Sequence, residues 1–247
     1  TVEEGGTGFT LLTGEAFSLP ADKVSMEQRA AEAFFAALGV PVPPLTVRLE
    51  KNIPAYAGLG GGSADVAALL RCLRRLYAAG MPDEALRAIG LIVGSDVPFC
   101  VSGGTSLAEG RGERLTDLPP LPVCQIVLCK PDFGISTPEL FVLADGAVLS
   151  KRPDIAGLTA ALQGGELTGV TDRLCNVFEE FLPERYREVF RIKEILLAHG
   201  ALNAAMSGSG PTVYGIFESA VEAQRAAEVL KKSYQQTYVA KPVKKLV

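Results

Sequence analysis

The stretch Pro54-Ala-Tyr-Ala-Gly-Leu-Gly-Gly-Gly-Ser-Ala-Asp65 decides the fold of this 247-residue chain. Its glycines let the backbone approach an anion closely and adopt positive φ. Residues 46–50 alternate as a strand does, and the apolar residues from Val66 to Tyr77 recur at helical spacing. A strand that enters a helix through glycines brings backbone N–H groups and the positive end of the helix dipole to one point. The stretch therefore predicts an anion-binding loop.

The loop matches neither of the common nucleotide motifs. No lysine follows the glycines as in GxxxxGK[ST], and no acidic residue stands about 20 positions on as in the dinucleotide motif. A purely structural glycine turn stays the alternative. Within the loop, Ser63 is expected to cap the helix or donate to a phosphate. Asp65 is expected in the first helical turn, where it stabilises the helix and can face a cation or a hydroxyl.

Composition narrows the function classes. The chain is 48% hydrophobic, enough for one large domain or two modest ones. A net charge of -4 disfavours nucleic acid as a partner. No apolar run approaches the length of about 18 residues that a membrane span needs, so we expect no membrane partner and a cytoplasmic protein. The 5 cysteines form no CxxC pair and are expected to be buried free thiols.

Strands and helices alternate along the chain, which predicts an α+β fold in two layers. The proline-rich run at 118–122 is a plausible linker, so we expect domains at 1–120 and 121–247. Residues 99–107 and 113–115 are expected to form a hairpin around Gly110-Arg-Gly112. A helix is expected to open at Thr137, with Thr137 as its cap, and another to run from 183 to 199.

Four segments, in the same order, resemble the GHMP kinase superfamily. They are Pro54–Asp65, Gly94-Ser-Asp-Val-Pro-Phe99, Ala108-Glu-Gly-Arg-Gly-Glu-Arg-Leu115 and Met206-Ser-Gly-Ser-Gly-Pro-Thr212. The last three resemble the branch that phosphorylates the 2-hydroxyl of 4-diphosphocytidyl-2-C-methyl-D-erythritol with ATP and Mg²⁺. The resemblance implies an N-terminal domain like ribosomal protein S5 domain 2 and a ferredoxin-like C-terminal domain. It also implies a small-molecule substrate and a monomer or weak homodimer.

The resemblance also assigns residues to the site. Asp96 matches the catalytic aspartate, which also contacts the acceptor, and Thr137 and Phe141 match positions at the cytidine end of the acceptor. The nucleotide-binding positions are Lys51, Pro54, Ala55, Tyr56, Ala57, Gly58, Leu59, Gly60, Gly61, Gly62, Ser63, Ala64, Asp65, Ser207, Gly208, Ser209 and Gly210.

The residues alone leave simpler interpretations open. Asp96 could be a turn-former that bonds its own backbone, and Lys51 a solvated lysine at a strand end. Thr137 could be only a helix cap, and Phe141 a core residue. The glycine turn at 206–211 could be purely structural.

One motif of the family has no match. Its first motif, an Ala-Lys-Ile-Asn strand followed by Gly-Tyr-His, is absent from the sequence. Either this motif precedes Thr1 in the complete protein, which the otherwise intact motifs favour, or this chain cannot perform the full reaction. Two rival hypotheses stay open. One is another kinase of the superfamily, acting on mevalonate, phosphomevalonate or homoserine; the other is a non-catalytic nucleotide-binding or S5-like module.

Overall fold

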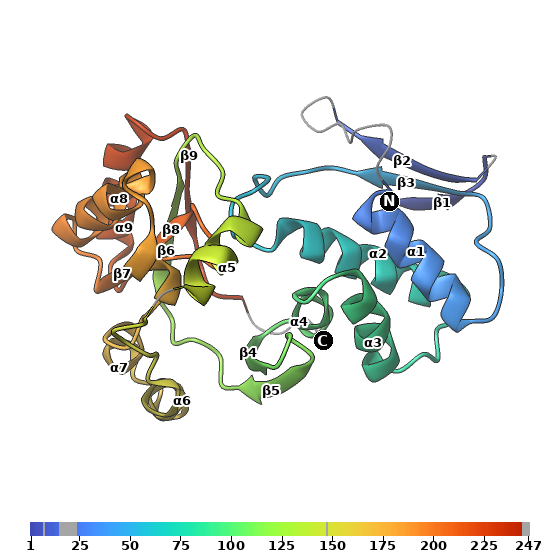
Figure 1. The fold of residues 1–247 in the computed structure, drawn as a ribbon, viewed down its shortest axis with the longest axis horizontal. Helices are drawn as coiled ribbons and strands as arrows, with labels where there is room; N and C mark the ends of the chain where they lie inside the picture. The colour runs from blue at the N-terminus through green and yellow to red at the C-terminus, as the bar shows by residue number, and fades with distance from the viewer. Residues whose placement is uncertain (7, 15–23, 147, 244–247) are drawn as a thin grey trace. The chain divides into compact units, whose positions relative to one another are not determined.

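The computed structural model describes residues 1–6, 8–14, 24–146 and 148–243. The chain divides into two compact units, drawn in Figure 1. Unit 1 comprises Thr1–Ile53 and Gly60–Asp117, and unit 2 comprises Pro54–Leu59 and the chain from Leu118 onward. The glycine-rich loop is thus shared between the units, at the bond between Leu59 and Gly60.

A small sheet and two helices form the main layers of unit 1. The sheet has the order β1-β3-β2, with β2 parallel and β1 antiparallel to β3. Helices α1 and α2 pack against it (Figure 1), and Phe34, Leu45 and Leu70 are fully buried between the layers. The bounds are β1 (Val2–Glu4), β2 (Phe9–Thr13), α1 (Met26–Ala37), β3 (Leu45–Leu49) and α2 (Gly61–Tyr77). The strand predicted over residues 46–50 and the helix predicted from Val66 to Tyr77 are confirmed as β3 and α2.

The rest of unit 1 corrects one prediction. The hairpin around Gly110-Arg-Gly112 is confirmed as β4 (Thr105–Glu109) and β5 (Arg114–Leu118). Residues 99–102, however, belong to helix α4 (Val97–Ser102), which follows α3 (Asp83–Val93). Pro98 lies in the first turn of α4, where its missing N–H costs nothing, and Val97 and Val101 are buried one turn apart.

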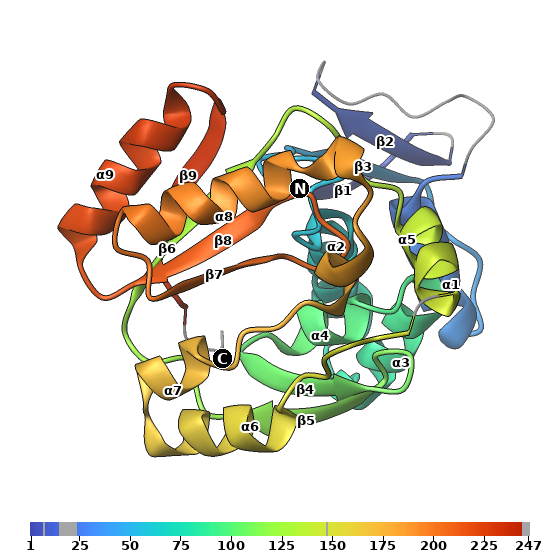
Figure 2. The same ribbon diagram turned by 60° about the vertical axis from the view of Figure 1, so that its left-hand side comes forward.

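Unit 2 is built on a four-stranded antiparallel sheet with the order β7-β8-β6-β9. Helices α8 and α9 cover one face of this sheet (Figure 2). The bounds are β6 (Gln125–Lys130), α8 (Glu188–Ala198), β7 (Asn203–Met206), β8 (Val213–Phe217), α9 (Ala220–Lys231) and β9 (Gln236–Ala240). This βαββαβ order with its antiparallel sheet is the ferredoxin-like arrangement that was predicted.

The connection from β6 to α8 differs from the prediction. It contains α5 (Thr137–Asp145), α6 (Ile155–Gly164), α7 (Leu167–Thr171) and the short 3₁₀ helices η1 (Val177–Phe181) and η2 (Glu184–Tyr186). The helix predicted over 183–199 is confirmed as α8 over residues 188–198, but its predicted start is wrong, because residues 184–186 form the separate η2. Helices α6 and α7 were not predicted. Ala161, Leu162 and Val170 bury a small apolar cluster between α6 and α7.

Two further predictions concern the cysteines and membrane-spanning segments. All five thiols are free, but Cys72 and Cys175 are exposed, so the prediction that the cysteines are buried is wrong for these two. Burial raises the pKa of the Cys129 thiol to about 11. Among the described residues, no helix combines the length and the apolar character needed to cross a bilayer.

Candidate active site

The second part of the glycine-rich loop opens α2. Gly60 is the N-cap residue in the left-handed conformation, with φ 64°, and the Ala64 N–H donates to the Gly60 carbonyl at 2.9 Å. The N–H groups of Gly61, Gly62 and Ser63 therefore come before the helical ladder, at the positive end of the dipole. Such a helix start is an anion site.

This geometry corrects two predictions. Ser63 does not cap the helix, because the helix already begins at Gly61 and its N-cap residue is a glycine without a side chain. Asp65 consequently falls in the second helical turn and not in the first. The Ser63 hydroxyl is thereby left to other partners at the helix start.

Lys51 lies just beyond β3 and forms an ion pair with Asp65 of α2. Their side chains are only 16% and 19% exposed. The interpretation of Lys51 as a solvated lysine is therefore wrong. The pair fixes the end of the strand to the helix that the glycines open.

The first part of the loop, residues 54–59, packs against the second glycine loop within unit 2. The Ser207 hydroxyl donates to the Gly58 carbonyl at 2.8 Å, and the Thr212 N–H donates to the Ala57 carbonyl at 3.3 Å. Gly58 has φ +70°, and a Cβ at Gly58 would lie 2.3 Å from the Ser207 carbonyl oxygen. Only glycine fits this contact.

The second glycine loop, Ser207–Gly210, connects β7 to β8. Its Gly210 N–H donates to the Ser207 carbonyl at 2.8 Å, and Gly208 and Gly210 have positive φ. The hydroxyls of Thr137 and Ser209 are 2.7 Å apart. The structure thus brings together Thr137, Ser209 and Gly58, which the sequence placed in different motifs.

Helix α5 presents the two residues predicted for the acceptor. The cap is Ser136, whose hydroxyl accepts from the Glu139 N–H, so the prediction of Thr137 as cap is wrong. Phe141 is 56% exposed, which excludes the core interpretation. Its ring meets Phe178 edge-on, with centroids 5.3 Å apart. The free face of an aromatic ring held in this way can stack on a planar group.

Asp96 is exposed at the N-terminus of α4. Within the described residues its carboxylate forms no capping bond with the helix. The interpretation of Asp96 as a side-chain turn-former is therefore not supported. Burial raises the pKa of the Cys100 thiol, and the negative charge of Asp96 raises it further.

A glycine contact holds the backbone next to Asp96. Gly112, in the turn between β4 and β5, has φ +107°, and a Cβ there would lie 2.3 Å from the Ser95 carbonyl oxygen. The Glu113 carboxylate accepts from the Arg111 N–H at 2.6 Å. The pKa of this carboxyl lies below its usual range because its own N–H and that of Arg111 donate to it. The closed turn thus packs directly on the residue before Asp96.

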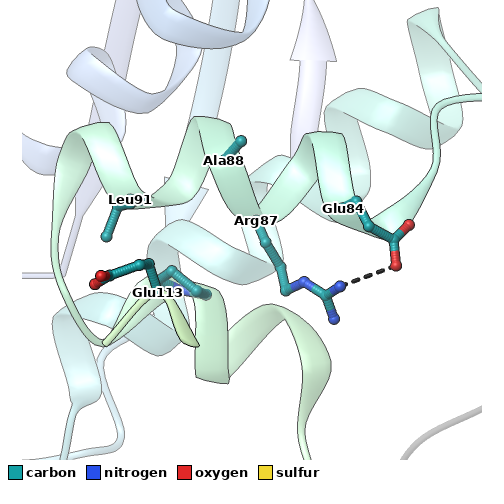
Figure 3. Close-up of a pocket in the computed structure, with 6 residues that line it drawn as sticks. Glu84, Arg87, Ala88, Leu91 and Glu113 are labelled. Atoms are coloured by element: carbon teal, nitrogen blue, oxygen red, sulfur yellow. Dashed lines mark hydrogen bonds and ion pairs between the residues drawn. The ribbon is translucent and has the colours of Figure 1, made fainter. Parts of the chain in front are cut away.

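Two cavities lie inside single units. One, of about 280 Å³, lies in unit 1 and contains none of the predicted site residues (Figure 3). It is lined by Glu84, Arg87, Ala88, Leu91, Pro98 and Glu113. The other, of about 410 Å³, lies in unit 2 and includes Ser207 and Gly208 of the second glycine loop. The second of these cavities therefore includes residues of the predicted site.

No group of three or more potential metal ligands gathers among the described residues. Mg²⁺ in phosphoryl-transfer sites is held largely by the phosphates with one or two carboxylates, so a dense protein cluster is not required. Asp65, at the loop helix, is a carboxylate of suitable type. It is already paired with Lys51.

Comparison with known families decides the assignment. The chain matches the GHMP kinases N terminal domain over residues 25–104 and the GHMP kinases C terminal domain over residues 158–236. The chain belongs to the GHMP kinase family. The kinase therefore has the two-domain α+β fold that the sequence predicted, and the glycine-rich loop lies within the part of the chain that matches the N-terminal domain.

Similar proteins place this GHMP kinase more narrowly. A protein of Clostridium acetobutylicum named 4-diphosphocytidyl-2-C-methyl-D-erythritol kinase is 35% identical over 94% of this chain and 82% of its own length. One of the same name from Enterococcus faecalis is 43% identical over 81% of this chain and 70% of its own length. A crystal structure of 4-(cytidine 5'-diphospho)-2C-methyl-D-erythritol kinase superposes with a TM-score of 0.77 at 30% identity, covering 98% and 84% of the two chains.

Other solved GHMP structures share the fold. A homoserine kinase from Cytophaga hutchinsonii gives a TM-score of 0.75 at 20% identity, with 99% of this kinase and 84% of that chain covered. At this identity the likeness shows the fold alone.

Two residues that contact the second glycine loop were missed by the sequence analysis. Asn176, just before η1, donates to the carbonyls of Gly208 in the loop and of Met206 at the end of β7. Glu179, within η1, accepts from the Met206 N–H. The sequence feature that could have revealed these two contact residues is the polar pair Asn176 and Glu179, which encloses the apolar residues Val177 and Phe178.

Proposed function

We propose that this kinase transfers the γ-phosphoryl group of ATP to the 2-hydroxyl of 4-diphosphocytidyl-2-C-methyl-D-erythritol, in the non-mevalonate route to isoprenoid precursors. The observation that carries the proposal is the 35% and 43% identity to proteins of that name over most of both chains. The site geometry supports it, because a helix start opened by glycines and the exposed carboxylate of Asp96 suit phosphoryl transfer.

Asp96 acts as the base of the reaction and contacts the acceptor. The oxygen of the acceptor hydroxyl forms a bond to the γ-phosphorus while the bond from that phosphorus to the β–γ bridging oxygen breaks, and the hydroxyl proton passes to the carboxylate. ADP leaves with the bridging oxygen. A base of this kind contributes by accepting the proton as charge builds on the attacking oxygen.

The two glycine loops bind ATP. The N–H groups at the start of α2 hold phosphate oxygens, and residues 54–59 and 207–210 complete the nucleotide site. Support comes from the helix start at Gly61 and from the bond between Ser207 and Gly58. Lys51, fixed by Asp65, binds on the nucleotide side. Replacing Lys51 with Met should raise the KM for ATP; an unchanged value would remove Lys51 from the site.

Mg²⁺, when bound together with ATP, would neutralise negative charge on the phosphates. Ser63 and Asp65 are the residues that would reach it, and their place in the first two turns of α2 supports this. If Ser63→Ala and Asp65→Ala leave the Mg²⁺ dependence of the rate unchanged, both residues lose this role.

Thr137 and Phe141 bind the cytidine end of the acceptor, with Phe141 stacking on the base. The exposed ring of Phe141, held edge-on by Phe178, supports this role. Phe141→Ala should raise the KM for the acceptor and leave that for ATP unchanged. A change in the ATP value alone would contradict the assignment.

The proposals for domain bounds and oligomeric state rest on the same resemblance to GHMP kinases. Residues 1–120 and 121–247 form the N- and C-terminal domains, a division that the boundary between the units at Asp117 and Leu118 supports. We propose a cytoplasmic monomer or weak homodimer. Light scattering on the purified protein at increasing concentration measures the oligomeric state directly. A stable oligomer larger than a dimer would contradict the proposed monomer or weak homodimer.

The choice of acceptor is the direct test of the function. ATP consumption by the complete gene product is measured with 4-diphosphocytidyl-2-C-methyl-D-erythritol, mevalonate, phosphomevalonate and homoserine, each at equal concentration. We expect turnover with the first acceptor only. Turnover with one of the other three would replace the proposed substrate, and ATP binding without turnover of any acceptor would favour a binding module.

The turn at Gly112 supplies a prediction for the base. Alanine at Gly112 would overlap the Ser95 carbonyl, which displaces Asp96, and we expect kcat to fall roughly 10- to 100-fold. Gly39→Ala is the control, because Gly39 also has left-handed φ, at +71°, but meets nothing within 4 Å. Steady-state kinetics of both variants check this. Equal kcat values in Gly112→Ala and Gly39→Ala would show that the turn does not position Asp96.

A further inference from the structure

One side-chain amide bonds to the second glycine loop and to Met206, the residue just before it. The Asn176 Nδ2 donates to the carbonyls of Met206 and Gly208, both at 2.8 Å. The Oδ1 of the same side chain accepts from the Phe178 N–H at 3.0 Å, which caps η1. Every hydrogen-bonding atom of the Asn176 amide group is thus engaged with backbone, and two of the three bonds hold the loop and Met206.

A carboxylate holds the entry to the same loop. The Glu179 Oε1 accepts from the Met206 N–H at 2.6 Å, and its Oε2 pairs with the Lys193 ammonium of α8. The Glu179 side chain is 15% exposed and that of Lys193 is 22% exposed, so water screens the pair only partly. Met206 is therefore fixed through its N–H by Glu179 and through its carbonyl by Asn176.

Loops of glycine and serine need such outside support. Gly208 and Gly210 have positive φ, a conformation that glycine adopts freely but does not enforce. The internal bonds of the loop, from Gly210 N–H to Ser207 and from Ser207 N–H to Thr212, close it at its ends. Asn176 holds the Gly208 carbonyl, whereas the bonds of Ser207 to Gly58 and of Ser209 to Thr137 hold the loop through its serine side chains. The backbone at Gly208 is therefore supported by Asn176.

We propose that Asn176 and Glu179 are positioning residues that hold the second glycine loop in the conformation that binds the phosphates of ATP. The inference rests on the proposed function, because it takes the loop to be part of the nucleotide site. Neither residue touches the reacting atoms. Each acts through the backbone of Met206 and Gly208.

Asn176→Asp is the sharpest variant. Aspartate keeps the shape and the acceptor for the Phe178 N–H, but it cannot donate and puts negative charge beside two carbonyls. We expect the KM for ATP to rise at least tenfold, because the backbone at Gly208 is released and repelled. Glu179→Gln, which keeps an acceptor for the Met206 N–H, should raise the same KM less than Glu179→Ala.

The chain offers a matched control in Asn203 of β7. Its Nδ2 donates to the Thr171 carbonyl at 2.7 Å and its Oδ1 accepts from the Ala204 N–H at 2.8 Å, so it is also a half-buried asparagine bonded to backbone. Asn203→Asp loses the same kind of bond away from the loop. We expect it to lower Tm as Asn176→Asp does while leaving the KM for ATP within about twofold of wild type.

The experiment measures ATP binding by calorimetry without acceptor, KM for ATP, and Tm for the four variants in the complete protein. A weaker ATP affinity in Asn176→Asp than in Asn203→Asp at equal Tm supports the inference. Equal affinities in these two variants overturn it. If Asn176→Asp does not fold, equal affinities in Glu179→Gln and Glu179→Ala overturn it. Failure of wild type to phosphorylate the acceptor while ATP binding responds as expected would overturn only the proposed function.

Discussion

Asp96→Asn should lower kcat by about a thousandfold, the range expected when a general base is removed. Asparagine has nearly the same shape but cannot take the proton of the attacking hydroxyl. Asp96 is exposed and forms no capping bond within the described residues, so its replacement disturbs little structure. Steady-state kinetics with saturating ATP and acceptor measure the loss.

The control separates the base from a change of charge. Asp172 is an exposed aspartate at the end of α7, and Asp172→Asn removes the same charge outside the predicted site. We expect it to keep wild-type kcat, and both variants to keep wild-type ATP affinity and stability within about 0.5 kcal/mol. An Asp96→Asn enzyme with more than a tenth of wild-type kcat would remove Asp96 from its role as base.

The start of α2 at the glycine-rich loop shows how much of the structure the local sequence predicts. The apolar spacing of Val66, Leu69, Leu70 and Leu73 predicts α2, and these residues are buried as expected. The first helical residue was not predicted correctly, because serine is a strong N-cap and Ser63 was available. Gly60 precedes the helix as its N-cap residue, in a left-handed conformation that the glycines of the loop permit at several positions equally.

Helix α4 shows where tertiary packing overrides local preference. Val97, Phe99 and Val101 favour a strand by their side chains. Val97 instead packs against Gly90 of α3, where a Cβ would lie 2.6 Å from its Cγ1. Such a contact between elements decides the conformation, and no local pattern in residues 97–102 reveals it.

Long-range bonds explain the missed residues of the site. Asn176 bonds to carbonyls 30 and 32 positions further along the chain, and Glu179 to an N–H 27 positions on. The short 3₁₀ helix η1 that carries Glu179 does not indicate in sequence which backbone groups these side chains reach. The glycine motifs could be predicted from their own residues, whereas the side chains that hold them depend on the folded sheet.

The largest effect on nucleotide binding is expected from Gly58→Ala. A Cβ at this position would lie 2.3 Å from the Ser207 carbonyl oxygen and 2.8 Å from that of Gly210, and both obstacles are backbone. The two glycine loops must then separate, and the bond from the Ser207 hydroxyl to the Gly58 carbonyl breaks. We expect the KM for ATP to rise roughly 100-fold, the cost of a displacement of about 1 Å in a positioning group. Kinetics at varied ATP measure it.

Gly165→Ala isolates the contact from the backbone strain. Gly165 ends α6 with φ +69°, close to the +70° of Gly58, but a Cβ there meets nothing within 4 Å. Both variants carry the cost of a left-handed alanine, about 1–2 kcal/mol of unfolding free energy. Only Gly58→Ala adds the overlap between loops, so Gly165→Ala should keep the wild-type KM for ATP. If the two variants lose stability equally and both keep that KM, the close approach of the loops does not contribute to nucleotide binding.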